Sequence, residues 1–254
     1  MSIRLPRASI VRRFACGAAV AIGAWAAGSD SSAIASNGGV RPGMVRVPSG
    51  TYVPLYALPA PATGATGTAK KRGVAVPAFD MDVHPVTNGE YLDFVRARPE
   101  WRRSRVAALF ADESYLRHWR GDLDPGDQAP AASPVVYVSW FAARAYLKAA
   151  GKALPTIDQW EYAAAGRNTY GVKGLHGPIR EWTLDFNSSL VTGESRADSA
   201  LERTLYCGSG AMGASNFEDY AAFMRFAYRS SLEARYAVAN LSFRGVLQPT
   251  RRTP

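Results

Sequence analysis

The sequence predicts an α+β domain with few helices, several short strands and much irregular coil. Three observations support this fold class: helix-starting motifs at only three places, short β-type runs around them, and long polar loops. With 254 residues, of which 47% are hydrophobic and 20% charged, the chain is large enough to bury a substantial core. This composition excludes a mostly disordered protein.

Three segments combine an N-cap residue at their start with a helix-ending residue after them, which is the pattern of short, well-delimited helices. They are the helix capped by Thr87 with Glu90 and stopping before Pro99, the helix from Trp140 to Ala150 capped by Ser139 and closed by Gly151, and the helix capped by Thr156 with Gln159 and ended by Gly166.

Short runs of β-forming residues predict strands at 44–47, 134–138, 204–207 and 241–247. The run 224–229 alternates with period two, but its apolar residues would also suit a helix, so both structures stay open for it. Residues 60–68 and 121–133 are polar and rich in Pro and Gly or Asp, and are predicted to be surface loops.

The first 35 residues have the features of a signal peptide. A positive region (Arg4, Arg7, Arg12 and Arg13) precedes an apolar stretch at 14–28 and a small-x-small cleavage site at 33–35. The apolar stretch is short against the roughly 20 residues that span a bilayer, which favours cleavage over an uncleaved membrane anchor. The adjacent Arg12 and Arg13 also suggest the twin-arginine route. We therefore expect one mature domain at 36–254, periplasmic or secreted, without stable membrane insertion.

Charge and cysteine content limit the partners and the redox chemistry. The predicted signal peptide carries four arginines and one aspartate, so its removal lowers the net charge from +9 to +6. The remaining arginines are scattered, without the dense basic stripe of nucleic-acid-binding proteins, so no nucleic-acid partner is expected. Cys16 leaves with the signal peptide and Cys207 is then the only cysteine, which excludes an intramolecular disulfide and a CxxC site.

Five segments in a fixed order resemble the motifs of the formylglycine-generating-enzyme, or sulfatase-modifying factor, superfamily. They are VHPVTNGEY at 83–91, PVVYVSW at 134–140, GKALPTIDQWEYAA at 151–164, GPIREWT at 177–183 and NLSFR at 240–244. The resemblance implies the C-type-lectin-like α+β fold of this superfamily. The tail from Tyr206 to Leu232 resembles a bacterial branch described as nitrite-reductase-associated, whose members look like accessory proteins of periplasmic respiratory enzymes.

The resemblance also implies two metal sites, and the sequence departs from both. The oxidising members carry two nearby cysteines that bind copper before the closing motif, whereas residues 215–231 contain no cysteine, so copper is not expected. Their calcium site maps onto Gly177, Ile179, Glu181 and Gly174. Gly174 offers no side-chain oxygen, so at most a weak residual calcium site at Gly177, Ile179 and Glu181 is expected, with Glu181 paired to an arginine as the alternative.

Binding residues are expected around the GPIREWT motif, which lines the cleft in the superfamily, and in the cysteine-free segment. The candidates are Arg180, Glu181, Asp185, Arg225 and Arg229. Whether the chain is an enzyme stays open. The first hypothesis is an accessory or maturation factor that binds a periplasmic protein or peptide. The second is a non-cysteine oxidase acting on a small molecule or peptide. The missing cysteine pair argues against a third, a sulfatase activator.

Overall fold

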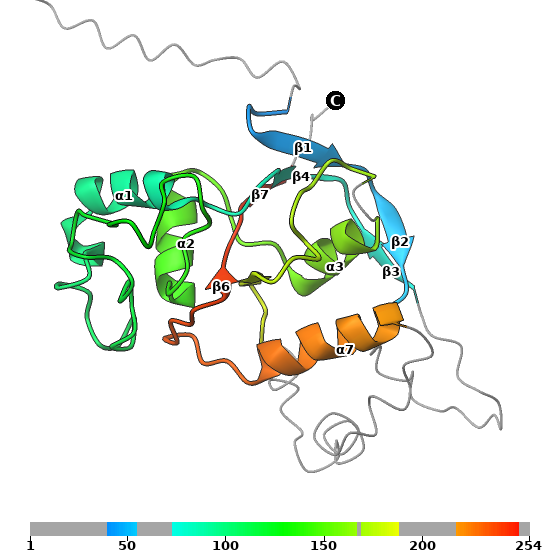
Figure 1. The fold of residues 1–254 in the computed structure, drawn as a ribbon. Coiled ribbons are helices and arrows are strands. Elements are labelled where there is room, and N and C mark those ends of the chain that lie inside the picture. The colour runs from blue at the N-terminus through cyan, green and yellow to red at the C-terminus, as the bar shows by residue number, and fades with distance from the viewer. Residues whose placement is uncertain (1–39, 55–72, 167–168, 188–216, 249–254) are drawn as a thin grey trace, which may run out of the picture. The chain divides into compact units, whose positions relative to one another are not determined.

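The computed structural model describes residues 40–54, 73–166, 169–187 and 217–248, which form the mixed α+β fold expected (Figure 1). The helices in these ranges are α1 (Asn88–Ala97), η1 (Pro99–Trp101), α2 (Trp140–Ala149), α3 (Ile157–Ala165) and α7 (Phe217–Ser230). The strands are β1 (Met44–Val47), β2 (Gly50–Tyr52), β3 (Val74–Val76), β4 (Phe79–Asp82), β5 (Arg180–Glu181), β6 (Leu241–Ser242) and β7 (Val246–Leu247). No helix within these ranges has the length and apolar character needed to cross a bilayer.

The three helices predicted from capping motifs are confirmed. The Thr87 hydroxyl accepts from the Glu90 N–H while the Glu90 carboxylate accepts from the Thr87 N–H, and Thr156 and Gln159 repeat this capping box at α3. The Ser139 hydroxyl accepts from the Ala142 N–H and caps α2. Local side-chain chemistry therefore fixes the start of each of these helices.

Two of the strand predictions need correction. Residues 134–138 form no strand beyond a single bridge between Pro134 and Thr87, because Tyr137 has a left-handed backbone with φ of 56° that breaks the extended run. The predicted strand at 241–247 is divided into β6 and β7 by the irregular residues 243–245, among which Arg244 is buried. The strand expected at 204–207, the loop at 60–68 and the signal peptide lie outside the described residues.

Three small sheets hold the segments together. β1, β4 and β7 form an antiparallel sheet, with Met44 opposite Asp82 and Met81 opposite Val246. β2 and β3 form an antiparallel pair, and β5 and β6 a short parallel pair in which Glu181 lies opposite Ser242. The parallel pair joins the GPIREWT and NLSFR motifs.

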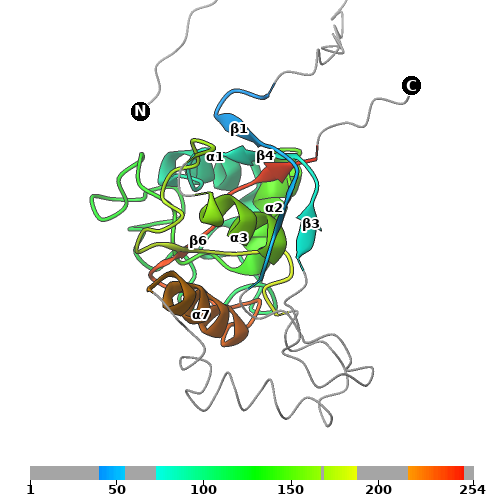
Figure 2. The same cartoon turned by 90° about the vertical axis from the view of Figure 1, so that its right-hand side faces the viewer.

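Two hydrophobic clusters form the core. One surrounds Tyr91 of α1, Leu147 of α2 and Trp182, and the other packs Phe79 and Met81 of β4 against Trp160 of α3. Both ribbon views place α7 on the side of α3 that faces away from β1, β4 and β7 (Figures 1 and 2). The sequence pattern of residues 224–229 fitted both a strand and a helix. In the structure these residues belong to α7 and are helical.

Candidate functional site

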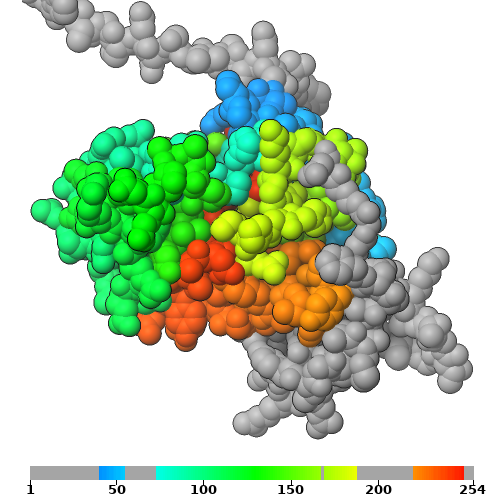
Figure 3. Space-filling view, viewed as in Figure 1, coloured from blue at the N-terminus to red at the C-terminus, as the bar shows by residue number. Residues whose placement is uncertain are grey.

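A small pocket lies where α7 approaches α3 and β5. Its lining residues are Trp160, Leu175, Ile179, Arg180, Glu181, Arg225, Tyr228 and Arg229. The space between them amounts to about 260 Å³ with open solvent included. In the space-filling view, α7 borders the segment that carries α3 and β5 (Figure 3). The pocket therefore combines residues from three separate parts of the chain.

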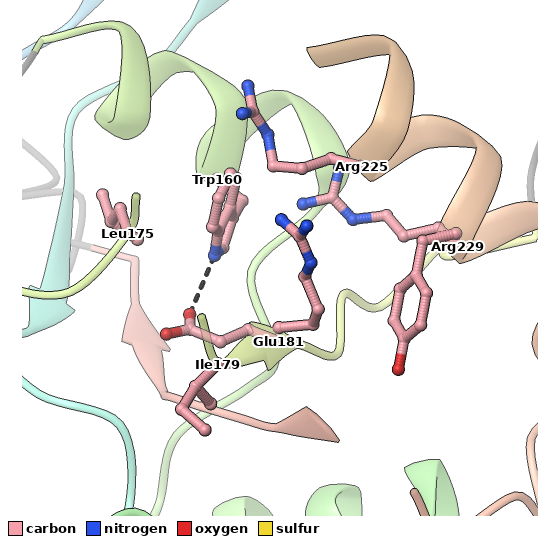
Figure 4. A pocket seen from close by; sticks show the side chains of 8 residues that line it. Trp160, Leu175, Ile179, Glu181, Arg225 and Arg229 are labelled. Atoms are coloured by element: carbon pink, nitrogen blue, oxygen red, sulfur yellow. Dashed lines mark hydrogen bonds between the residues drawn. The ribbon is translucent and has the colours of Figure 1, made fainter. Parts of the chain in front are cut away.

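Trp160 is the centre of the pocket. Its side chain is 2% exposed, and its indole N–H donates to a Glu181 carboxylate oxygen at 2.8 Å. The guanidinium carbons of Arg225 and Arg229 lie 5.4 and 4.7 Å from the centre of its ring, within the range of cation–π attraction. Figure 4 shows both arginines reaching from α7 toward this indole, with Glu181 at its N–H. Trp160 thus belongs to the hydrophobic core and also lines the pocket.

Glu161, the next residue of α3, binds both arginines of α7. Arg225 donates through Nε and Nη2 at 3.1 and 2.7 Å, and Arg229 through Nη1 at 2.6 Å. The two arginines can share one carboxylate because positions four apart lie on the same face of a helix. Burial by itself would raise the pKa of Glu161, but the two guanidinium groups outweigh burial and the pKa is lowered. Glu161 is therefore ionised at neutral pH.

Glu181, on the opposite side of Trp160, forms a fully buried pair with Arg244. Arg244 donates through Nε and Nη2 to the two carboxylate oxygens at 2.7 and 2.6 Å, and both side chains are at most 1% exposed. Its remaining N–H groups bind the backbone carbonyls of Asp82, Val83 and Lys173 at 2.8 to 3.1 Å. Both members of this pair thus have their hydrogen bonds satisfied inside the protein.

The calcium ion that the resemblance implied does not fit this arrangement. A bound calcium needs six to eight oxygen ligands, and the only carboxylate of the predicted set, Glu181, is already neutralised by Arg244. Gly174 supplies no side-chain oxygen and has a left-handed φ of 80°. A calcium titration tests the residual site at Gly177, Ile179 and Glu181, and we expect no binding because Arg244 occupies Glu181.

Thiolate-bound copper does not fit the described residues either. Cys16 and Cys207 both lie outside the described ranges, and within those ranges no three His, Cys, Asp or Glu side chains gather as metal ligands would. Residues 215–231, where the sequence analysis found no cysteine, contain all of α7, which contributes arginines to the pocket.

Four of the five predicted binding residues meet at this pocket: Arg180, Glu181, Arg225 and Arg229. The fifth, Asp185, does not line it. Its carboxylate accepts from the Ile157 N–H at 2.8 Å at the start of α3, and its pKa is raised chiefly by burial. The sequence analysis missed Glu161 and Arg244 as partners, because each lies more than 60 residues from the group it binds.

Comparison with known proteins identifies the family. Residues 31–167, just over half of the chain, match the family described as the sulfatase-modifying factor enzyme 1-like domain. This chain belongs to that family. The five motifs in the sequence therefore predicted the superfamily correctly.

Individual relatives include proteins with and without a named activity. The chain is 32% identical over 171 residues to the bovine inactive Cα-formylglycine-generating enzyme 2, covering 56% of this chain and 53% of that protein. It is 31% identical over 190 residues to the formylglycine-generating enzyme of Streptomyces coelicolor, covering 63% and 57%. It is 36% identical over 104 residues to the hercynine oxygenase of Mycobacterium tuberculosis, covering 36% and 24%. The chain spans about half the length of the first of these relatives.

Proposed function

We propose that this protein is an exported accessory or maturation factor that binds a periplasmic protein or peptide in the pocket between α3, β5 and α7. One observation carries the proposal. The segment where the resemblance places the cysteine pair of the oxidising enzymes instead supplies Arg225 and Arg229, which bind Glu161 beside Trp160. Guanidinium groups recognise ligands and do not activate oxygen. The similarity to a relative named as inactive agrees with a binding role.

The proposal includes the location and the architecture of the mature chain. Residues 1–35 act as a cleaved signal peptide, and residues 36–254 form one domain with the C-type-lectin-like fold of the superfamily. The segment from Tyr206 to Leu232 supports membership of the nitrite-reductase-associated branch. N-terminal sequencing of the periplasmic protein should begin at or near Ser36. An intact N-terminus in the membrane fraction would contradict the signal-peptide part.

A non-cysteine oxidase is the second candidate. The similarity to hercynine oxygenase favours it, since that relative is named for an oxygen-dependent reaction. Elemental analysis of the mature protein, purified without added metal, separates the two candidates. The binding role predicts copper and iron far below one ion per chain. Stoichiometric copper or iron would favour the oxidase and count against the accessory role.

A further inference from the structure

The pocket holds more positive than negative charge. Arg180, Arg225 and Arg229 line it, and Glu161 is the only carboxylate in contact with any of them in the described part of the chain. The second carboxylate of the lining, Glu181, is neutralised by Arg244. Counting the lining residues and their ion-pair partners, the balance is an excess of two positive charges, and the nearby Asp185 carboxylate also interacts with the charge of Arg229.

Several of the guanidinium N–H groups have no partner among the residues that the structure describes. Arg180 forms no hydrogen bond or ion pair with any described side chain, and Arg229 uses only Nη1 on Glu161. The buried side-chain atoms that lack a partner in the described ranges belong to His118, Thr183 and Ser242. Arginine donors are absent from that set, so the unused donors are open to water in the pocket.

Two of the three arginines, Arg225 and Arg229, are held in place before any ligand arrives. Arg229 is 4% exposed, and both arginines of α7 lie over the Trp160 ring and on Glu161. Burying a guanidinium group in excess of its counterion costs stability, so such an excess is typical of a binding site rather than of a structural pair. A planar guanidinium fork fits the oxygens of a carboxylate or a phosphate.

We infer that this pocket binds a small oxyanion, either a carboxylate or a phosphate group, through Arg180, Arg225 and Arg229. The inference rests on the proposed function and names the chemical group by which the partner is recognised. The size of the pocket limits what enters it. Because the pocket is small, it takes an end group rather than a whole ligand of ordinary size.

The test is a titration of the purified protein followed by NMR on the indole N–H of Trp160, which lies between both sets of charges. The probes are sodium acetate, sodium phosphate and a short capped peptide with one Glu, each against sodium chloride at the same ionic strength. The Gln version of the peptide is its matched control. A saturable shift with an oxyanion, absent with chloride, is expected. Acetate, phosphate and peptide arms distinguish a free carboxylate, a phosphoryl group and an acidic side chain.

Arg180→Gln is the decisive variant, because its side chain pairs with no described residue and its loss leaves the Glu161 and Glu181 pairs intact. The variant should raise the dissociation constant for the oxyanion about tenfold or more, as expected for losing a charged hydrogen-bonding partner. Arg98→Gln, an equal charge change at an exposed position after α1, should leave it unchanged.

Three results would overturn the inference: no saturable shift with any oxyanion, an equal shift with chloride, or equal affinities in the two variants. These failures are separable from failure of the proposed function. If oxyanions do not bind and the protein holds no stoichiometric copper or iron, only the inference falls. If stoichiometric copper or iron is present, the accessory role falls whether or not oxyanions bind.

Discussion

Two sets of arginine–glutamate pairs lie on either side of Trp160, and they differ in stoichiometry and in exposure. Arg244 and Glu181 match one to one, are fully buried and have their hydrogen bonds satisfied. Arg225 and Arg229 share Glu161 at the edge of a pocket and keep unused donors. The same ion-pair chemistry therefore supports the fold on one side of the indole and presents charge to a ligand on the other.

The largest effect on stability is expected at the fully buried Glu181–Arg244 pair. Glu181→Gln leaves the Arg244 charge buried without a counterion, so the free energy of unfolding should fall by about 3–5 kcal/mol. Urea denaturation measures it. Glu233→Gln is the matched control, since Glu233 pairs with Arg235 at the surface and the change should cost less than about 1 kcal/mol. Equal losses in both variants would remove the structural role given to Glu181.

A smaller loss of stability is expected where Glu161 pairs with Arg225 and Arg229. In Glu161→Gln the two arginines lose their carboxylate but still reach water in the pocket, so the free energy of unfolding should fall by about 1.5–3 kcal/mol. Because the folded pKa of Glu161 is lowered from 4.5, its contribution is present above pH 4.5 and lost as pH falls through the folded pKa. As pH falls below 4.5, the free energy of unfolding of the variant should therefore decrease less than that of the wild type. A loss as large as that of Glu181→Gln would contradict the distinction between the pairs.

His118 should also make stability depend on pH, in a higher pH range than Glu161 does. Both of its ring nitrogens are buried without a partner, and burial, with Arg103 nearby, lowers its pKa to about 4. The folded state thus resists protonation, and stability should decrease as pH falls from about 6.5 to about 4. Melting temperatures of His118→Phe should vary less across this window. An unchanged pH dependence would place the titration elsewhere.

The smallest expected effect is that of calcium. Because Arg244 already neutralises Glu181, the wild-type melting temperature should respond neither to millimolar calcium nor to a chelator. Calcium at 100 times its dissociation constant would add about 2.7 kcal/mol, which a melting curve detects easily. An upward shift that is lost in Glu181→Gln would show that the residual calcium site exists.

The same contrast separates what the sequence could predict from what it could not. Helices α1, α2 and α3 follow from caps such as Thr87 and Ser139, which act within a few residues. The Glu161–Arg225 and Glu181–Arg244 pairs join residues more than 60 positions apart, and no local pattern encodes them. Strand β4 was missed because two of its four residues are aspartates, which are unusual in a buried strand. Both can be buried because Asp80 pairs with Arg46 and Asp82 with Lys152.

The pocket residues could be predicted in part: the sequence pointed to the residues but not to their meeting in one pocket. The motif resemblance drew attention to Arg180 and Glu181, and the missing cysteines drew it to the segment of Arg225 and Arg229. That these meet on one pocket follows from the parallel pairing of β5 with β6 and from α7 being a helix. Period-two and helical patterns overlap in residues 224–229, so tertiary contact with α3 had to decide between them.

We propose that this protein does not carry out the thiol-dependent oxidation of the oxidising enzymes, because residues 215–231 supply arginines and no cysteine. The most direct measurement is mass spectrometry of a sulfatase-type cysteine peptide after incubation with the protein, with and without copper. The account predicts unmodified peptide under both conditions, since the segment from Ser215 to Ser231 contains no thiolate pair. Formation of the aldehyde product at catalytic turnover would contradict it.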